Sequence, residues 1–184
     1  MNSQQFTKEL FKKQEALKAY IYNIFPARAG NISVRFVNGN FRAQGWQGKS
    51  FQRWKAIKRK GTILVKKGAL RRGTYYTTQP GTAHVKNNVK YAAVHNRGFK
   101  GTVNIKTHNR KIYQGTKVGT GKFTKTGKEK TKTIHTVKNI ATVKAHTRKM
   151  NIAKRQFMPD SINDSPVLAN AIRREIEREI KKIF

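Results

Sequence analysis

The sequence predicts an α+β fold: a small antiparallel β-sheet packed by N- and C-terminal helices, with a long extended β-arm insertion. Three observations lead to this prediction. Apolar residues recur at helical spacing near both ends, the centre carries short segments rich in Thr, Val and Tyr, and one long stretch is dominated by Lys, Thr and Gly. We therefore expect a single α+β core domain, residues 1–98 plus 151–184, and a basic Lys/Thr-rich β-arm, residues 99–150.

Two helices are expected at the N-terminal end of the chain. Residues 3–24 carry five apolar side chains at helical spacing, with lysines on the other faces. Pro26 should end this helix, because proline lacks the backbone N–H that continues the hydrogen-bond ladder. A second helix is expected over residues 29–43, although Gly30 and Gly39 weaken its local propensity.

Residues 44–61 are expected to form an irregular basic loop. Two tryptophans, Trp46 and Trp54, lie there among several lysines and arginines. Aromatic side chains interleaved with basic ones can stack on the bases of single-stranded nucleic acid. Tryptophans in a small domain also serve as core or interface anchors. We favour the second interpretation.

The centre of the chain is expected to be β-rich. Residues 62–66 are interpreted as a short strand. Residues 73–78 and 82–86 flank a Pro-Gly pair that suits the two central positions of a type II turn, so they predict a β-hairpin. Residues 89–95 predict a short helix, and Gly98 then marks a point where the chain reverses.

Residues 99–150 supply the predicted arm. Residues 102–107 alternate as a strand does, whereas residues 118–133 have the composition of a flexible loop. Residues 134–143 are interpreted as a strand with a β-bulge, because apolar residues recur every three positions in a segment rich in Thr, Val and Ile. An isolated arm of this composition should be mobile, so we expect a neighbouring subunit to hold it.

Residues 166–184 predict the last helix. Ser165 is a favourable N-cap, and Pro166 suits the first helical position. An apolar stripe runs along this helix from Leu168 to Ile183. We expect the stripe to pack onto the sheet of the same domain.

The charge balance points to a polyanionic partner. The 184 residues include 41 Lys and Arg but only 8 Asp and Glu, a formal net charge of +33. Such a surface attracts nucleic acid, because each neutralised phosphate releases counterions. It also fits a place inside a large assembly, where acidic neighbours or packaged DNA offset the charge. Direct DNA binding and such a place in an assembly carry about equal weight.

Several classes of protein are excluded on composition. The absence of cysteine rules out disulfides and zinc–thiolate sites. The first residues lack the apolar region of a signal peptide, and no segment is apolar enough for a membrane span. We expect a chain made in the cytoplasm, with no membrane partner and no cofactor.

The tripeptide His-Asn-Arg occurs twice, at residues 95–97 and 108–110, and so suggests a nuclease site. Two-metal nuclease chemistry needs carboxylates to hold cations about 4 Å apart. No carboxylate occurs between Glu15 and Glu129. We therefore expect no catalytic residue and no metal ligand there. His95 is expected at the end of a short helix, and His108 on a strand among polar residues.

Short motifs in a fixed order carry a resemblance to a known family. The order is an N-terminal helix, Phe41-x-x-x-Gly45 with Trp54 following, Gly-Thr-Ile-Leu-Val, Gly-x-Leu-Arg-Arg, Tyr-Ala-x-x-His-x-x-Gly and Arg-x-Phe before a terminal helix. This order resembles the phage virion-morphogenesis or tail-completion family of Mu-like tailed phages. The resemblance spans nearly the whole chain except residues 99–150. The motif and structural residues are Trp54, Gly68, Leu70, Tyr91, His95, Gly98, Arg155 and Phe157.

The resemblance implies a structural role without catalysis. Proteins of this family form rings at the neck or upper tail, where the tail joins the DNA-filled head. It implies a homo-oligomeric, six-fold ring in the virion, in contact with other neck, portal or tail proteins and with packaged double-stranded DNA. Tyr91 and His95 would hold a short helix against the sheet, and Arg155 and Phe157 would anchor the chain before the last helix.

The leading hypothesis is therefore a tail-completion, tail-terminator or neck protein at the phage head–tail junction, assembled in the host cytoplasm. Lysines of the arm are the candidates for contact with nucleic acid: Lys117, Lys122, Lys125, Lys128, Lys130 and Lys132. The alternative is a basic nucleic-acid-binding module, either ribosome-associated or DNA-binding. The third hypothesis is a nuclease. The absence of Asp and Glu between Glu15 and Glu129 argues against it.

Overall fold

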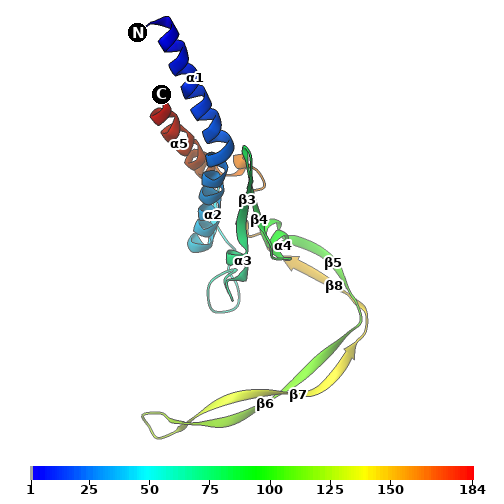
Figure 1. Ribbon diagram of the computed structural model, residues 1–184. Coiled ribbons are helices and arrows are strands. Elements are labelled where there is room, and N and C mark those ends of the chain that lie inside the picture. The colour runs from blue at the N-terminus through cyan, green and yellow to red at the C-terminus, as the bar shows by residue number, and fades with distance from the viewer. Residues whose placement is uncertain (1) are drawn as a thin grey trace. The chain divides into compact units, whose positions relative to one another are not determined.

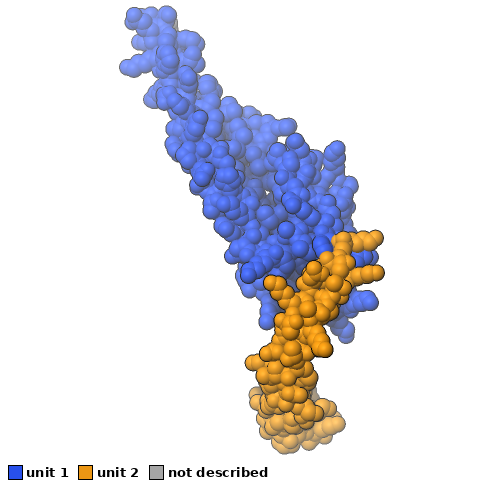
Figure 2. All heavy atoms as spheres, turned by 90° about the vertical axis from the view of Figure 1, so that its right-hand side faces the viewer, with its two compact units in different colours: residues 1–99, 151–184 blue, residues 100–150 orange. Residues whose placement is uncertain are grey.

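The computed structural model describes residues 2–184, and helices and antiparallel hairpins both occur among them (Figure 1). The α+β class predicted from the sequence is confirmed. The strands are distributed over four two-stranded sheets rather than gathered in one. The chain divides into two compact units, Met1–Phe99 with Asn151–Phe184 (unit 1) and Lys100–Met150 (unit 2), drawn blue and orange in Figure 2.

The N-terminal helices run on from one to the next through a wider turn. Helix α1 covers Ser3–Ala19, a π-helical segment covers Tyr20–Ile24, and α2 covers Phe25–Ala43. The prediction that Pro26 ends a helix was wrong. Pro26 lies in the first turn of α2, directly after the π-helical segment. The backbone oxygen of Tyr22, which an N–H at position 26 would bond in an α-helix, accepts instead from the backbone N–H of Gly81 at 3.0 Å. The predicted second helix exists and begins four residues earlier than expected.

Helix α2 supplies one wall of the main hydrophobic core. Its side chains Val37 and Phe41 are buried together with Trp54, Leu70 and Phe157. The ring centroids of Phe41 and Phe157 lie 5.1 Å apart, and those of Phe41 and Trp54 lie 5.5 Å apart in an edge-to-face arrangement. This core joins segments that are more than a hundred residues apart in the sequence.

The segment after α2 differs from the prediction in two places: two strands form within the predicted loop, and the predicted strand at residues 62–66 is absent. Gly45–Gln47 (β1) and Phe51–Arg53 (β2) form a short antiparallel pair. The predicted strand at residues 62–66 does not form. The side chain of Gln44 explains this: its Oε1 accepts a hydrogen bond from the backbone N–H of Ile63 at 2.7 Å, in place of a neighbouring strand. Leu64 then adopts a left-handed conformation, with φ of 60°, that no strand contains.

The predicted central hairpin is confirmed. Thr74–Gln79 (β3) and Thr82–Asn87 (β4) pair antiparallel around Pro80 and Gly81, and Gly81 has the positive φ of 70° that a type II turn requires. Helix α2 packs against this hairpin. The contact is close because Gly30 of α2 has no side chain, and an added Cβ would overlap the ring of Tyr76.

Two short helices frame the rest of the core. Helix α3 covers Ala69–Arg72, and α4 covers Ala92–Arg97. The second one starts three residues later than predicted and ends two residues later. Gly98 follows α4 with φ of 78° and ψ of 169°, so the expected chain reversal occurs there.

The last helix, α5, covers Pro166–Ile183, close to the predicted range. Ser165 caps it as predicted, because its Oγ accepts a hydrogen bond from the backbone N–H of Leu168 at 3.2 Å. The same hydroxyl donates to the backbone oxygen of Gln47 at 2.5 Å, which ties the cap to β1. A short 3-10 helix, Ile162–Asp164, precedes the cap.

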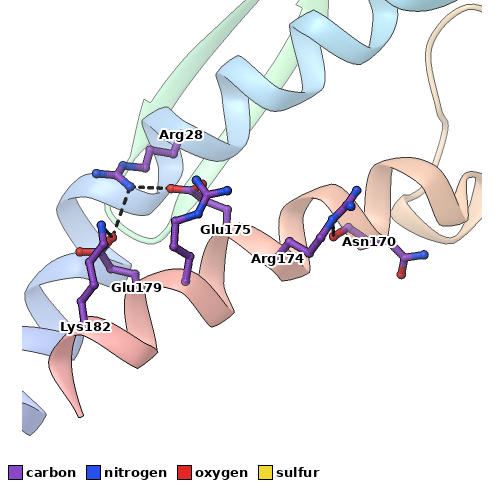
Figure 3. Close-up of polar contacts among 7 residues, drawn as sticks. Arg28, Asn170, Arg174, Glu175, Glu179 and Lys182 are labelled. Carbon is purple, nitrogen blue, oxygen red and sulfur yellow. Dashed lines mark hydrogen bonds and ion pairs between the residues drawn. The ribbon is translucent and has the colours of Figure 1, made fainter.

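The expectation that α5 packs onto a sheet was wrong, because α5 packs chiefly on α2 and α1. Figure 3 shows the polar contact between α5 and α2. Nη1 of Arg28, from α2, donates to Oε1 of Glu175 at 2.5 Å and to Oε2 of Glu179 at 3.3 Å. Glu175 is only 8% exposed, and Arg178 is its second partner. Burial of this carboxylate is tolerated because two guanidinium groups neutralise it.

Unit 2 is built on a long β-hairpin. His108–Phe123 (β6) pairs antiparallel with Glu129–Val143 (β7), and Phe99–Ile105 (β5) pairs with His146–Ile152 (β8) at its base. The predicted bulge is confirmed: Ile112 faces Asn139 and Tyr113 faces Val137, which leaves Lys138 unpaired. The prediction of a flexible loop at residues 118–133 was wrong, because only residues 124–128 lie outside the strands.

Candidate nucleic-acid interface

The β6–β7 hairpin has no core of its own. No side chain in either strand is buried, and both strands keep an open edge because the sheet has two strands only. A 16-residue strand extends over about 50 Å. An isolated two-stranded hairpin is marginally stable in water, so a surface of this length is stabilised when a partner covers it.

The charge of unit 2 defines what such a partner can be. Its 51 residues contain fourteen Lys and Arg and one acidic residue, Glu129. That carboxylate is engaged within the hairpin, since its Oε1 accepts a hydrogen bond from the backbone N–H of Gly121 at 2.9 Å. The remaining side-chain charges are all positive, so the hairpin presents an attractive field to a polyanion.

The six lysines singled out in the sequence lie along the distal half of this hairpin. Lys117 and Lys132 occupy opposite faces, because Lys117 pairs with Thr133 while Lys132 pairs with Val118, and neighbouring pairs alternate between faces. Lys125 and Lys128 lie in the turn. Lys122 lies next to the end of β6, and Lys130 lies next to the start of β7. The lysines therefore surround the end of the hairpin instead of lining one face.

The motif residues of unit 1 fall into two neighbouring groups. Phe157 is 0% exposed and lies in the core beside Trp54. The indole Nε1 of Trp54 donates to the backbone oxygen of Gln156 at 2.8 Å, which fixes the segment that carries Phe157. Both residues therefore hold the fold together, and neither is accessible to a ligand.

The second group lines a pocket of about 420 Å³. Gly68, Leu70, Tyr91, His95 and Arg155 all contribute to its walls, although they come from three separate stretches of sequence. Gly98 lies beside this group: a Cβ on it would stand 2.9 Å from the backbone nitrogen of Lys154 and 3.1 Å from the backbone oxygen of Ile152. The sequence motif thus marks a local structure in which α4 meets the chain that leads to Phe157.

His95 has an altered protonation equilibrium in this pocket. Burial of the imidazole lowers its pKa below the ordinary 6.5, and the nearby guanidinium of Arg155 lowers that pKa further. Its Nδ1 is buried without a hydrogen-bond partner. The backbone oxygen of His95 accepts a hydrogen bond from the N–H of Arg155 at 2.8 Å, so the two residues are held together.

The two His-Asn-Arg tripeptides have different surroundings. In the first, Asn96 hydrogen-bonds the backbone of Phe157 and Met158, and Arg97 pairs with Asp160 at 2.9 Å. In the second, at residues 108–110, the side chains are exposed on β6, and Oδ1 of Asn109 accepts a hydrogen bond from Thr142. Within residues 2–184, no three His, Asp or Glu side chains are grouped closely enough to hold a metal ion.

Sequence reasoning missed two residues that organise this region. Asn96 is buried and bonds the chain beside the core, and Gln44 holds the loop that forms one wall of the pocket. The His-Asn-Arg tripeptide suggested a catalytic role for Asn96. Its amide instead forms hydrogen bonds with backbone groups, as a buried asparagine side chain can, because it has both donors and an acceptor. No local pattern marks Gln44, because its partner Ile63 lies nineteen residues away.

Comparisons with known proteins leave the family open. No protein-family model, curated protein or solved structure matches this chain. Among the described residues, none of the helices combines the length and the apolar character that crossing a lipid bilayer requires.

Proposed function

We propose that this chain is a structural subunit of a tailed-phage virion, located at the junction where the tail joins the DNA-filled head. In this role it is a tail-completion, tail-terminator or neck protein and assembles into a homo-oligomeric ring. Its partners are further copies of itself, other neck, portal or tail proteins and packaged double-stranded DNA.

The observation that carries this proposal is the hairpin of unit 2. It extends over about 50 Å without a buried side chain, so its own strand pairing leaves it marginally stable and contact with other molecules stabilises it further. A ring subunit has such neighbours on two sides, because a heterologous interface uses a different patch on each side. The positive charge also fits a ring whose channel carries DNA, since contacts with phosphates bind without reading sequence.

Helix α1 gives independent support for an assembled state. None of its residues is buried, and it exposes three large apolar side chains: Phe6 at 58%, Leu10 at 49% and Phe11 at 61%. Exposed apolar groups of this size are typical of surfaces that contact another protein. Helix α1 and the hairpin are therefore two separate surfaces on which we expect other subunits to bind.

The test is the oligomeric state and the location of the protein. Electron microscopy of purified protein and of intact virions should show rings at the head–tail junction. The matched control is a version in which Gln114–Thr136 is replaced by a two-residue Asn-Gly turn. It lacks most of the hairpin, whereas the sequence of unit 1 stays unchanged. A protein that remains a monomer at high concentration and is absent from purified virions would exclude the proposal.

The second candidate function is a basic nucleic-acid-binding module, and the fourteen basic residues of unit 2 favour it. Co-purification separates the two. RNA that accompanies the chain, without capsid or tail proteins, would favour a ribosome-associated or other nucleic-acid-binding role over a virion role.

A further inference from the structure

The pocket of unit 1 that His95 lines carries four cations without counterions. Arg59, Lys66, Lys67 and Arg155 contribute to its walls, and no acidic side chain does. None of the five ion pairs found among residues 2–184 involves any of these four. Cations gathered in a concave site strengthen one another's potential, so this pocket attracts an anion more strongly than the open surface does.

Two of these cations are held in place before any ligand binds. Arg59 donates from Nη2 to the backbone oxygen of Thr62 at 2.8 Å and from Nη1 to that of Lys60 at 3.2 Å, and Nε of Arg155 donates to the backbone oxygen of Lys55 at 3.1 Å. A guanidinium group has five N–H donors, so both arginines keep further N–H groups for a ligand. Fixed guanidinium groups lose little freedom on binding phosphate, which they recognise through paired N–H donors.

The lining of the pocket also includes apolar and aromatic side chains. Ile57 and Leu64 contribute aliphatic surface, and Tyr91, which is 48% exposed, contributes an aromatic ring. The rings of Tyr91 and His95 pack edge to face at 5.6 Å, which limits the orientation of Tyr91. A flat heterocycle gains contact with such an aromatic ring and aliphatic wall.

Local strain converges on the same place. Leu64 has a φ of 60°, in the left-handed region that is unfavourable for a residue with a bulky side chain. The buried Nδ1 of His95 has no hydrogen-bond partner. Strained backbone clusters at active sites and ligand clamps, where the surrounding structure maintains it.

We propose that this pocket binds a nucleotide, with its phosphate on Arg59, Lys66, Lys67 and Arg155 and its base against Tyr91. The volume of about 420 Å³ lies in the range of small-molecule sites. A phosphate alone would leave the aromatic wall unused, and an acidic peptide would not need it. This inference concerns unit 1 only and does not depend on the proposed virion role.

The experiment uses the full chain and the ring signals of His95 in NMR as a local reporter. The chain has five histidines, and a His95→Gln variant assigns the signal. Adenosine monophosphate and a short single-stranded oligothymidylate are titrated separately at about 0.2 M salt, where general attraction to exposed charges is screened over roughly 7–8 Å. Saturable shifts of the His95 signal with the mononucleotide indicate a free nucleotide as ligand. Shifts with the oligonucleotide only indicate a nucleotide within a strand.

Matched variants separate this site from the general positive charge. Lys66→Ala with Lys67→Ala should weaken nucleotide affinity at least tenfold, whereas Lys12→Ala with Lys18→Ala on α1 removes the same charge and should change it less than twofold. Tyr91→Leu should weaken binding of the nucleotide without changing binding of inorganic phosphate. Circular dichroism checks that each variant is folded.

Three results would overturn the inference. The first is an unshifted His95 signal with both ligands. The second is an equal loss of affinity in the two lysine pairs, which would mean that the attraction is unspecific. The third is binding of inorganic phosphate or of a polyglutamate peptide as tight as that of the nucleotide or oligonucleotide that shifts the His95 signal.

Discussion

The side chain of Asn96 holds the backbone of Met158 from both sides. Its Nδ2 donates to the backbone oxygen of Met158 at 3.0 Å, and its Oδ1 accepts from the backbone N–H of Met158 at 2.9 Å. The same oxygen accepts from the N–H of Phe157, also at 2.9 Å. Asn96 is buried, so helix α4 is tied to the core segment by three hydrogen bonds that water does not replace.

Replacing Asn96 with alanine should therefore lower stability strongly. The substitution leaves two backbone N–H groups and one carbonyl without partners in a buried place, and we expect a loss of about 2–4 kcal/mol in the free energy of unfolding. Urea denaturation of the full chain measures it. Asn109→Ala, at the exposed second tripeptide, is the matched control and should cost less than about 0.5 kcal/mol. Similar losses at the two sites would show that Asn96 is not a structural link.

Gly98 should be intolerant of any side chain. Its φ of 78° and ψ of 169° belong to a region that only glycine adopts readily, and a Cβ would press on the backbone of Lys154. Gly98→Ala should destabilise the protein by about 1–3 kcal/mol. Gly121 has a similar φ of 68° but no atom within 4 Å of an added Cβ. Gly121→Ala therefore tests conformation without crowding, and thermal unfolding should rank Gly98→Ala as the more damaging change.

The parts of the fold that the sequence predicted correctly depend on short-range chemistry. The cap at Ser165 and the turn at Pro80 and Gly81 use residues whose backbone preferences are strong and local. The bulge at Lys138 was visible for the same reason, because an apolar period of three fits a strand only if one residue drops out of register.

The errors share a different cause, since distant partners decide those segments. Residues 62–66 have strand-forming side chains, but Gln44 satisfies the backbone of Ile63 and no strand lies beside it. Pro26 is a helix breaker by composition, yet the N–H of Gly81 bonds the backbone oxygen of Tyr22 that proline leaves without its helical partner. Neither partner can be identified from the neighbouring residues.

The candidate sites divide in the same way. The motif residues Tyr91, His95 and Arg155 were found by their order in the sequence, and they do meet at one pocket. The loop cations Lys66 and Lys67 were not singled out. They are two of 41 basic residues, and only the folded loop shows that they line the same pocket as Arg155.

The protonation of His95 gives a prediction on pH. Burial, and then Arg155, lower the pKa of this imidazole in the folded state below 6.5. The unfolded chain therefore takes up the proton first as the pH falls. The contribution of His95 to stability should decline below about pH 6.5 and level off once the folded state is protonated as well.

The measurement is the difference in unfolding free energy between the natural chain and His95→Gln at pH 7.5, 6.5 and 5.5. Only the difference is informative, because other groups titrate in both proteins. As the pH falls, the unfolding free energy of the natural chain should decrease relative to that of the His95→Gln variant. Arg155→Met should raise the pKa of His95 without restoring it fully, since burial is the larger cause. A difference that stays constant with pH would contradict a lowered pKa.

The last prediction concerns the six lysines at the distal end of the hairpin. Changing Lys117, Lys122, Lys125, Lys128, Lys130 and Lys132 to Gln should weaken binding to double-stranded DNA and lower its dependence on salt. If all six contact phosphates, the slope of log affinity against log salt should fall by about 5, because each contact contributes about 0.9. Fluorescence anisotropy over a series of salt concentrations measures both quantities.

The matched control removes the same charge from the same unit. Lys100, Lys106, Lys111, Lys138, Lys144 and Lys149 lie nearer the base of the hairpin, and their change to Gln leaves the distal lysines in place. A distal contact with DNA requires that the first set lower the slope by more than the second set does. Equal effects would mean that unit 2 attracts DNA through its total charge, and the assignment of the six distal lysines would then be wrong.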